Sequence, residues 1–333
     1  MNAPALIPSP ISATVDYAAD GIQHGFLKLP HSHDDSAWGA IMIPVIVIKN
    51  GDGPTALLTA GNHGDEYEGQ IALRKLVHQI DLSDVTGRII MLPAMNYPAA
   101  KAGRRTSPID GGNMNRAFPG RPDGTMTERI ADYITRILLP MADVVLDIHS
   151  GGRTLEIIPF AACHVLDDTN QQARCVAARN AFAAPYALMM QELDALGMYD
   201  TVIEDMGKTF VTTEIFGGGT TTPASIAIAE RGVRNILKHA GVLAGSLETF
   251  ETQILTMPDG CFVACETDGL LEPLVGLGEP VTVGQAVARV HAFSRTDVAP
   301  VTYHAPLNGL LAGRHFQGRI AMGDNICMLA VPE

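Results

Sequence analysis

The chain has 333 residues, of which 47% are hydrophobic and 18% charged, a composition typical of a soluble globular protein with one large domain and a smaller one. Its 36 acidic residues outnumber its 23 basic residues, which gives a formal net charge of −13. No cluster of Lys or Arg stands out, so nucleic acids and anionic membrane surfaces are disfavoured as partners. The longest apolar stretch, residues 40–48, is far shorter than the roughly 20 residues that span a bilayer.

The N-terminal residues and the cysteines indicate a compartment. Residues 1–20 contain no basic region and are broken by three prolines, so they do not resemble a secretory signal, and a cytoplasmic location is expected. The five cysteines are odd in number and none has CxxC spacing, which favours reduced thiols over disulfides or a sulfur-rich zinc site. A metal ion would therefore be held by histidines and carboxylates.

Five short apolar runs rich in β-branched residues predict buried strands. Helical patterns lie between several of them, which favours an α/β domain with a largely parallel or mixed sheet covered on both faces. In such sheets ligands bind beyond the carboxyl ends of the strands. The predicted strands are residues 41–49, 56–60, 88–93, 143–149 and 209–216.

Two of the predicted helices have clear end signals. The segment 126–139 begins with a capping box of Thr125 and Glu128 and is closed by a proline. Another helix has Thr222 as its N-cap, a proline at its first position and a glycine, Gly241, just past its end. Further helices are predicted at residues 66–80 and 169–182.

After Gly245 the pattern changes to short apolar runs separated by Gly and Pro. It predicts a second, all-β domain of roughly 75 residues, and we divide the chain into residues 1–250 and 251–333. The pattern is similar to the barrel-sandwich of biotinyl and lipoyl domains, but the last lysine is Lys238. A lysine-attached cofactor is therefore excluded, and a cap, a dimerisation surface or a support for the substrate entrance is favoured.

A candidate metal site lies at the ends of two predicted strands. His63 and Glu66 are three residues apart in GNHGDEYEG, across a turn that can point an imidazole and a carboxylate at one metal ion. His149 would complete a set of three ligands, which leaves one position open for water as in catalytic zinc sites. Asp147 shares the face of His149 and could orient it. Taken singly, each histidine is more simply a core or loop side chain; the metal site is favoured because both lie at strand ends with a matching carboxylate.

Other charged residues are candidates for substrate binding and catalysis. Arg116, beside Asn115, offers a planar guanidinium for a substrate carboxylate, and either Arg104 or Arg105 could stabilise an oxyanion. Glu214, near the end of the last predicted strand of the α/β domain, could act as a general base and then a general acid. The alternatives are a solvated Arg116 and a Glu214 that faces solvent.

The segments GNHGDEYEG, NMNRAFPG, DIHSGG and TTEIFGG, in this order, resemble the succinylglutamate desuccinylase/aspartoacylase family, relatives of zinc carboxypeptidases that hydrolyse N-acyl amino acids. The resemblance covers residues 40–330. It implies a zinc carboxypeptidase-like mixed sheet flanked by helices, with a smaller C-terminal all-β domain, and one Zn²⁺ per chain. The implied roles are zinc binding by His63, Glu66 and His149, catalysis by Glu214, oxyanion stabilisation by Arg105 in preference to Arg104, and binding of the substrate carboxylate by Asn115 and Arg116.

Within the family, the chain looks most like the bacterial deacetylases of ectoine breakdown, which implies hydrolysis of Nα-acetyl-L-2,4-diaminobutyrate. The side-chain ammonium of that substrate would suit an acidic pocket, for which Glu192 and Asp194 are candidates unless they lie in a solvated loop. A deacylase of the succinylglutamate or acetylaspartate type, a metallocarboxypeptidase and a non-catalytic protein that binds amino-acid derivatives are the alternatives. The acidic surface and the β-rich C-terminal segment are compatible with a homodimer.

Overall fold

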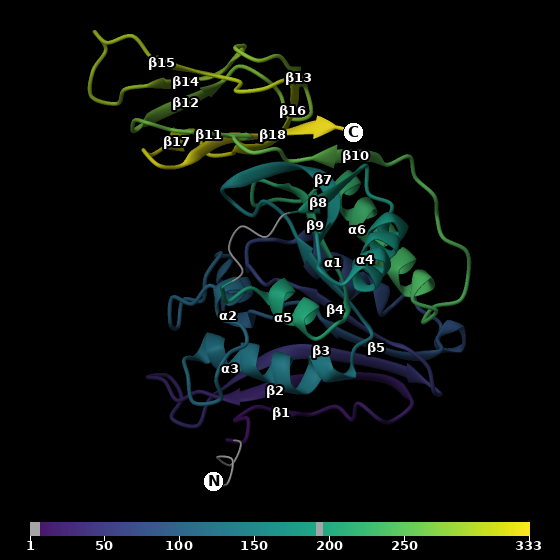
Figure 1. Ribbon diagram of the computed structural model, residues 1–333. Coiled ribbons are helices and arrows are strands. Elements are labelled where there is room, and N and C mark those ends of the chain that lie inside the picture. Colours follow the sequence, from purple (N-terminus) through teal and green to yellow (C-terminus); the bar gives the residue numbers. More distant parts are fainter. Residues whose placement is uncertain (1–6, 191–195) are drawn as a thin grey trace, which may run out of the picture.

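The computed structural model describes residues 7–190 and 196–333 (Figure 1). A 14-stranded mixed sheet runs through the whole molecule. Its strands, in sheet order, are β1 (Ser12–Ala13), β2 (Gly21–Pro30), β3 (Ala40–Asn50), β5 (Gly87–Leu92), β4 (Thr55–Ala60), β6 (Val144–His149), β9 (Thr209–Gly217), β7 (Leu155–His164), β8 (Tyr186–Met190), β10 (Gln253–Thr256), β18 (Asn325–Pro332), β16 (Gly309–His315) and β13 (Pro280–Val281), with β11 (Phe262–Ala264) paired to β18.

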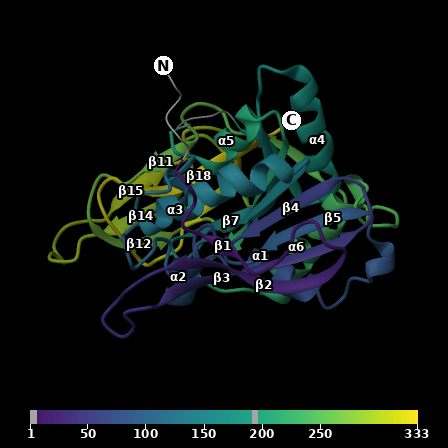
Figure 2. The ribbon, with the colours of Figure 1, turned by 90° about the horizontal axis from the view of Figure 1, so that it is seen from below.

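The five strands predicted from apolar runs form the centre of the sheet. β5, β4, β6 and β9 are parallel neighbours, and β3 pairs antiparallel with β5. Figure 2 views the molecule from below, with β2 and β3 in front and the C-terminal segment behind them. The predicted mixed sheet is confirmed, and its parallel strands bring their carboxyl ends to one edge.

Helices cover both faces of the sheet (Figure 1). On one face, side chains such as Leu58 and Ile89 form an apolar core with α1 (Glu68–Leu76), α4 (Thr169–Phe182) and α6 (Pro223–His239). On the other face, Leu57 and Ile90 pack in a second core with α3 (Met126–Tyr133) and α5 (Tyr199–Asp205). Neighbouring residues of one strand thus enter opposite cores, as the pleat of a strand requires. A short helix, α2 (Tyr97–Ala102), follows β5.

The predicted helices are present, with differences at their ends. α4 has the predicted bounds, and α6 begins after Thr222, which forms a capping box with Ser225. The capping box of Thr125 and Glu128 is also present, but α3 changes after Tyr133 into a wider π-helical turn. α1 begins later than predicted because the residues before it form the turn that carries the candidate metal ligands.

The chain after residue 251 consists of strands, as predicted. Besides the strands that join the main sheet, it forms a four-stranded sheet of β15 (Val301–His304), β14 (Ala286–His291), β12 (Gly269–Pro273) and β17 (Arg319–Ile320). It has an apolar core of its own, which includes Val287 and Leu329. β10 nevertheless pairs with β8, and β16 pairs with β7, so this segment continues the main sheet. The boundary at residues 250 and 251 stays a prediction.

Two further expectations concern cysteines and membranes. All five cysteines are buried and free, as the sequence predicts. Within residues 7–190 and 196–333, no helix has both the length and the apolar character needed to cross a bilayer.

Candidate active site

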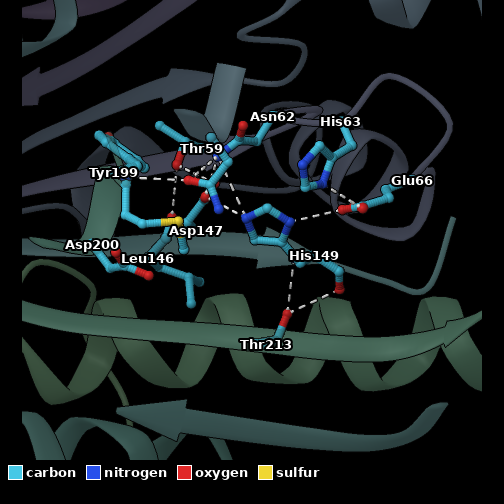
Figure 3. Close-up of polar contacts among 12 residues, drawn as sticks. Thr59, Asn62, His63, Glu66, Leu146, Asp147, His149, Tyr199, Asp200 and Thr213 are labelled. Atoms are coloured by element: carbon cyan, nitrogen blue, oxygen red, sulfur yellow. Dashed lines mark hydrogen bonds and ion pairs between the residues drawn. The ribbon is translucent and has the colours of Figure 1, made fainter. Parts of the chain in front are cut away.

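His63, Glu66 and His149 meet at the carboxyl ends of β4 and β6. The Nδ1 atom of His63 lies 2.7 Å from Glu66 Oε1, and the Nδ1 atom of His149 lies 2.9 Å from Glu66 Oε2 (Figure 3). The three residues are only 4%, 3% and 8% exposed. One donor atom from each lies within 4.8 Å of the other two. Two imidazole nitrogens and a carboxylate oxygen at this separation fit a Zn²⁺ ion and leave a position for water or substrate.

The turn before α1 depends on a glycine. A Cβ atom at Gly64 would lie 2.0 Å from the carbonyl carbon of Ala99, so any other residue would collide with the backbone of α2. This close approach lets the turn fold back so that His63 and Glu66 face the same point. The sequence motif therefore needs Gly64 for packing as well as His63 and Glu66 for their donor atoms.

Neighbouring charges shift the pKa values of Glu66 and His149. Burial alone would raise the pKa of Glu66, but the neighbouring His63 and His149 outweigh burial and lower that pKa below its usual range. Burial alone would lower the pKa of His149, but Asp147 and Glu66 raise it well above the usual value. In the absence of a cation these charges favour a proton on the His149 imidazole. A metal ion bound at this imidazole would replace that proton, so metal binding should release it.

Asp147 orients His149, as strand alternation predicts. His149 Nε2 lies 2.7 Å from Asp147 Oδ2, while Thr59 donates a hydrogen bond of 2.6 Å to Oδ1 and Asn62 one of 3.0 Å to Oδ2 (Figure 3). Because the Asp147 carboxylate accepts a hydrogen bond from Nε2, the other ring nitrogen of His149, Nδ1, is the atom left to bind a metal ion. Our sequence reasoning missed Thr59 and Asn62, whose signal was their position on either side of the end of β4.

A cavity of about 220 Å³ opens beside His63 and His149. Its lining mixes charged and apolar side chains. It includes the predicted site residues His63, Arg105, Asn115, Arg116, His149 and Glu214, but not Glu66. The lining residues are His63, Arg105, Asn115, Arg116, Asp147, His149, Ser150, Gly151, Leu155, Phe160, Met190, Met198, Asp200, Phe210, Thr212 and Glu214.

The two candidate arginines differ in position. Arg105 lines the cavity, and its Nη1 atom lies 3.7 Å from Glu66 Oε1. Both arginines are exposed, but Arg104 is absent from the cavity lining. The structure therefore brings Arg105, and not Arg104, close to the three candidate metal ligands.

Glu214 lies on β9 directly beside His149 on β6, where the two residues are register partners. Its side chain lines the cavity, and its Oε2 atom is buried without a hydrogen-bond partner. Burial, with a contribution from the charge of Glu66, raises the pKa of Glu214 to about 8. The carboxyl group thus faces the cavity, in contrast to the solvent-facing alternative, and can hold a proton near neutral pH.

Asn115 and Arg116, neighbours in the chain, both line the cavity. The Oδ1 atom of Asn115 accepts hydrogen bonds from Asn62 Nδ2 at 3.3 Å and from the backbone N–H of Tyr199 at 3.2 Å. The Arg116 guanidinium is more exposed, donates a 2.7 Å hydrogen bond to the backbone oxygen of Asn115 and contacts Met198. Both side chains face the cavity, so the structure brings them to the site.

The segment before α5 holds the remaining sequence candidates. Glu192 and Asp194 lie outside the described residues. Asp200, a few residues further on, is buried and lines the cavity. Sequence reasoning missed Asp200, although it belongs to the acidic segment that was already considered.

Comparisons with known proteins agree with this geometry. The family model described as the succinylglutamate desuccinylase/aspartoacylase catalytic domain matches residues 52–240. The chain is 62% identical over 326 residues to the N-alpha-acetyl-L-2,4-diaminobutyric acid deacetylase of Halomonas elongata, a match that covers 97% of this chain and 95% of that protein.

Solved structures give the same result. The product-bound ectoine utilization protein EutE (DoeB) from Ruegeria pomeroyi is 57% identical, with a TM-score of 0.96 and coverage of 98% of this chain and 100% of that chain. A succinylglutamate desuccinylase from Silicibacter is 55% identical, with the same TM-score and the same coverage. The chain therefore belongs to the succinylglutamate desuccinylase/aspartoacylase family.

Proposed function

We propose that this protein is a zinc-dependent deacetylase that hydrolyses Nα-acetyl-L-2,4-diaminobutyrate to acetate and L-2,4-diaminobutyrate in ectoine degradation. The observation that carries the proposal is the convergence of His63, Glu66 and His149 beside a cavity that Arg105 and Glu214 also line. The names of two similar proteins support the substrate. The relative from Halomonas elongata is named a deacetylase of this compound, and the relative from Ruegeria pomeroyi an ectoine utilization protein.

His63, Glu66 and His149 would hold the metal ion. When bound, Zn²⁺ lowers the pKa of water and polarises the acyl carbonyl. Glu214 takes the proton from the attacking water and returns it to the amide nitrogen as the C–N bond breaks. Arg105 stabilises the negative charge that develops on the carbonyl oxygen. Acetate and the free amino acid are the products.

Asn115 and Arg116 would bind the α-carboxylate of the substrate. A guanidinium pairs with a carboxylate through two parallel hydrogen bonds, and the Asn115 side chain is fixed by two hydrogen bonds of its own. Such anchoring places the acyl group rather than the side chain at the reacting atoms. Cleavage is therefore expected at the Nα position of the substrate.

The main alternative is a metallocarboxypeptidase that acts on the C-terminus of a peptide. A cavity of about 220 Å³ is compact, which favours a small N-acyl amino acid over a peptide. The cytoplasmic location and a homodimer stay predictions.

Amine release from a panel of substrates tests this function. The panel holds Nα-acetyl-L-2,4-diaminobutyrate, its Nγ-acetyl isomer, N-acetylaspartate, N-succinylglutamate and a tripeptide. We expect cleavage of the Nα isomer alone. Preferred cleavage of a dicarboxylic substrate would overturn the diaminobutyrate assignment, and cleavage of the tripeptide would favour the metallocarboxypeptidase.

A further inference from the structure

The roles assigned so far name no residue that binds the ammonium group of the proposed substrate. Nα-acetyl-L-2,4-diaminobutyrate carries an α-carboxylate and, at the end of its side chain, an ammonium group. Arg105 and Arg116 supply positive charge to the cavity, but an ammonium that leaves water needs an opposite charge or hydrogen-bond acceptors. Among the described lining residues, the carboxylates are those of Asp147, Asp200 and Glu214.

Two of these three carboxylates already have a task. Asp147 uses both of its oxygens, since Oδ1 accepts from Thr59 and Oδ2 faces Asn62 and His149. Glu214 is the register partner of His149, and we assign it to proton transfer at the scissile bond. Asp200 is the third carboxylate of this lining, and its place in the cavity makes it the candidate for a second charged group of the substrate.

The position of Asp200 suits this role. It lies in the first turn of α5, is 7% exposed and faces the cavity. In Figure 3 it lies across His149 from Glu66, on the side of Asp147. A substrate whose acyl group is at the His63, Glu66 and His149 cluster would therefore extend its side chain away from that cluster to reach Asp200.

The surroundings of Asp200 fix it relative to the substrate anchor. Its Oδ1 atom accepts a 2.7 Å hydrogen bond from the backbone N–H of Thr201, which limits rotation of the side chain. The residue before it, Tyr199, donates its backbone N–H to Asn115 at 3.2 Å. Asn115, which would bind the α-carboxylate, and Asp200, which would bind the ammonium, are thus linked through the backbone of Tyr199.

Apolar side chains complete the pocket. Met190, Met198 and Phe210 line the same cavity and can cover the two methylene groups between the α-carbon and the ammonium. An apolar lining that also holds a carboxylate suits a short side chain with a terminal cation.

We propose that Asp200 is the residue that determines specificity for a cationic side chain, by pairing with the side-chain ammonium of the substrate. This inference rests on the proposed deacetylase function and deepens it. Asp200 acts on binding of the substrate and takes no part in proton transfer.

The test compares two substrates of the same shape in wild-type protein and in Asp200→Asn. Nα-acetyl-L-norvaline has a methyl group where Nα-acetyl-L-2,4-diaminobutyrate has the ammonium. We expect Asp200→Asn to lower the preference for the diaminobutyrate compound, as the ratio of kcat/KM values, by about 100-fold. The loss should arise in KM, with kcat changed little. A merely structural role would lower the kcat/KM of both substrates alike and leave their ratio unchanged.

Asp205→Asn is the matched control, because Asp205 is the last residue of α5 and is exposed. It removes the same charge from the same helix without altering the cavity lining, so it should keep the wild-type ratio. Equal losses of preference in both variants would overturn the proposal, because a general field effect would then explain them.

A second variant keeps the charge and changes the reach. Asp200→Glu lengthens the carboxylate by one methylene, so we expect the preferred substrate to shift toward Nα-acetyl-L-2,3-diaminopropionate, which is one methylene shorter. An unchanged order of the two substrates would contradict direct pairing, even if Asp200→Asn fails to fold.

The failure of this inference and that of the proposed function are distinguishable. Wild-type protein that cleaves neither acetylated compound would overturn the deacetylase function. Wild-type protein that prefers the diaminobutyrate compound, together with an Asp200→Asn variant that keeps the preference, would overturn only the role of Asp200.

Discussion

The Glu214 carboxyl group lies beside His149, with one oxygen buried and without a hydrogen-bond partner. It contributes no donor atom to the cluster of His63, Glu66 and His149. A Glu214→Gln variant should therefore keep its metal and lose turnover, because an amide cannot accept the proton of the attacking water. We expect kcat to fall by about 10²- to 10⁴-fold, with the metal content of dialysed protein unchanged in elemental analysis. Loss of bound zinc would instead make Glu214 a ligand, and full activity would remove it from the mechanism.

The raised pKa of Glu214 also predicts a pH dependence of stability in chelated protein. The folded state binds this proton up to about pH 8, whereas the unfolded state releases it near pH 4.5. Glu214 therefore destabilises the metal-free fold progressively as the pH rises from about 4.5 to about 8. Chelated Glu214→Gln should be more stable than chelated wild-type protein by about 5 kcal/mol at pH 8.5, because each pH unit between the two pKa values contributes about 1.4 kcal/mol, with the difference vanishing near pH 4.5.

Urea unfolding of both chelated proteins across this pH range measures the effect. Glu68, whose pKa burial raises to about 7, is present in both proteins, so only the part of its titration that depends on the charge of Glu214 enters the difference. A difference that stays constant with pH, or grows toward acid, would contradict the assignment of the buried proton to Glu214.

At the scale of elements, β4 and β6 hold the site in place. Thr59 on β4 and Asn62 just after it donate to Asp147 on β6, which in turn faces His149. Asp147→Asn should weaken zinc binding by about 10- to 100-fold, because the amide is a poorer acceptor for the His149 N–H. Competition with a chromophoric chelator measures this affinity, and Glu214→Gln serves as the control that should not change it. An unchanged affinity in Asp147→Asn would show that His149 is oriented without this carboxylate.

The sequence predicts the central elements well because they are locally encoded. The strands that carry His149 and Glu214 are apolar runs bounded by polar or turn residues, and α6 is marked at both ends. The carboxyl ends of parallel strands meet at one edge of the sheet. The local strand patterns therefore already indicate where the candidate site lies. Spacing and family resemblance together indicated His63 and Glu66, which the structure brings together with His149.

Features that depend on pairing over long distances in the chain were not predicted. β7 pairs with β9 and with β8. The local hydrophobic pattern of the sequence does not predict these pairings. The family resemblance favoured Arg105 over Arg104, but no local pattern did, because the choice depends on the path of the chain after α2. The role of Thr59 depends on the register between β4 and β6. Asp200 reaches the cavity because α5 packs against β9.

At the scale of the whole molecule, the C-terminal strands close the edges of the α/β part. β16 pairs with β7, β10 pairs with β8, and an apolar cluster that includes Phe160 and Leu188 lies between them. A fragment of residues 1–250 would expose two unpaired edges and this cluster. We expect the fragment to be aggregated or unfolded in size-exclusion chromatography and circular dichroism, with the full chain as control. A monomeric fragment with full activity would show that the α/β part is independent.

The central claim is that His63, Glu66 and His149 hold a zinc ion required for deacetylation. The most direct test is amine release from Nα-acetyl-L-2,4-diaminobutyrate by chelated protein, with Zn²⁺ titrated back. We expect activity to be lost on chelation and restored in full by one equivalent of zinc per chain, and His63→Ala protein to stay inactive over the same titration. Undiminished cleavage by protein shown to be metal-free would contradict the claim.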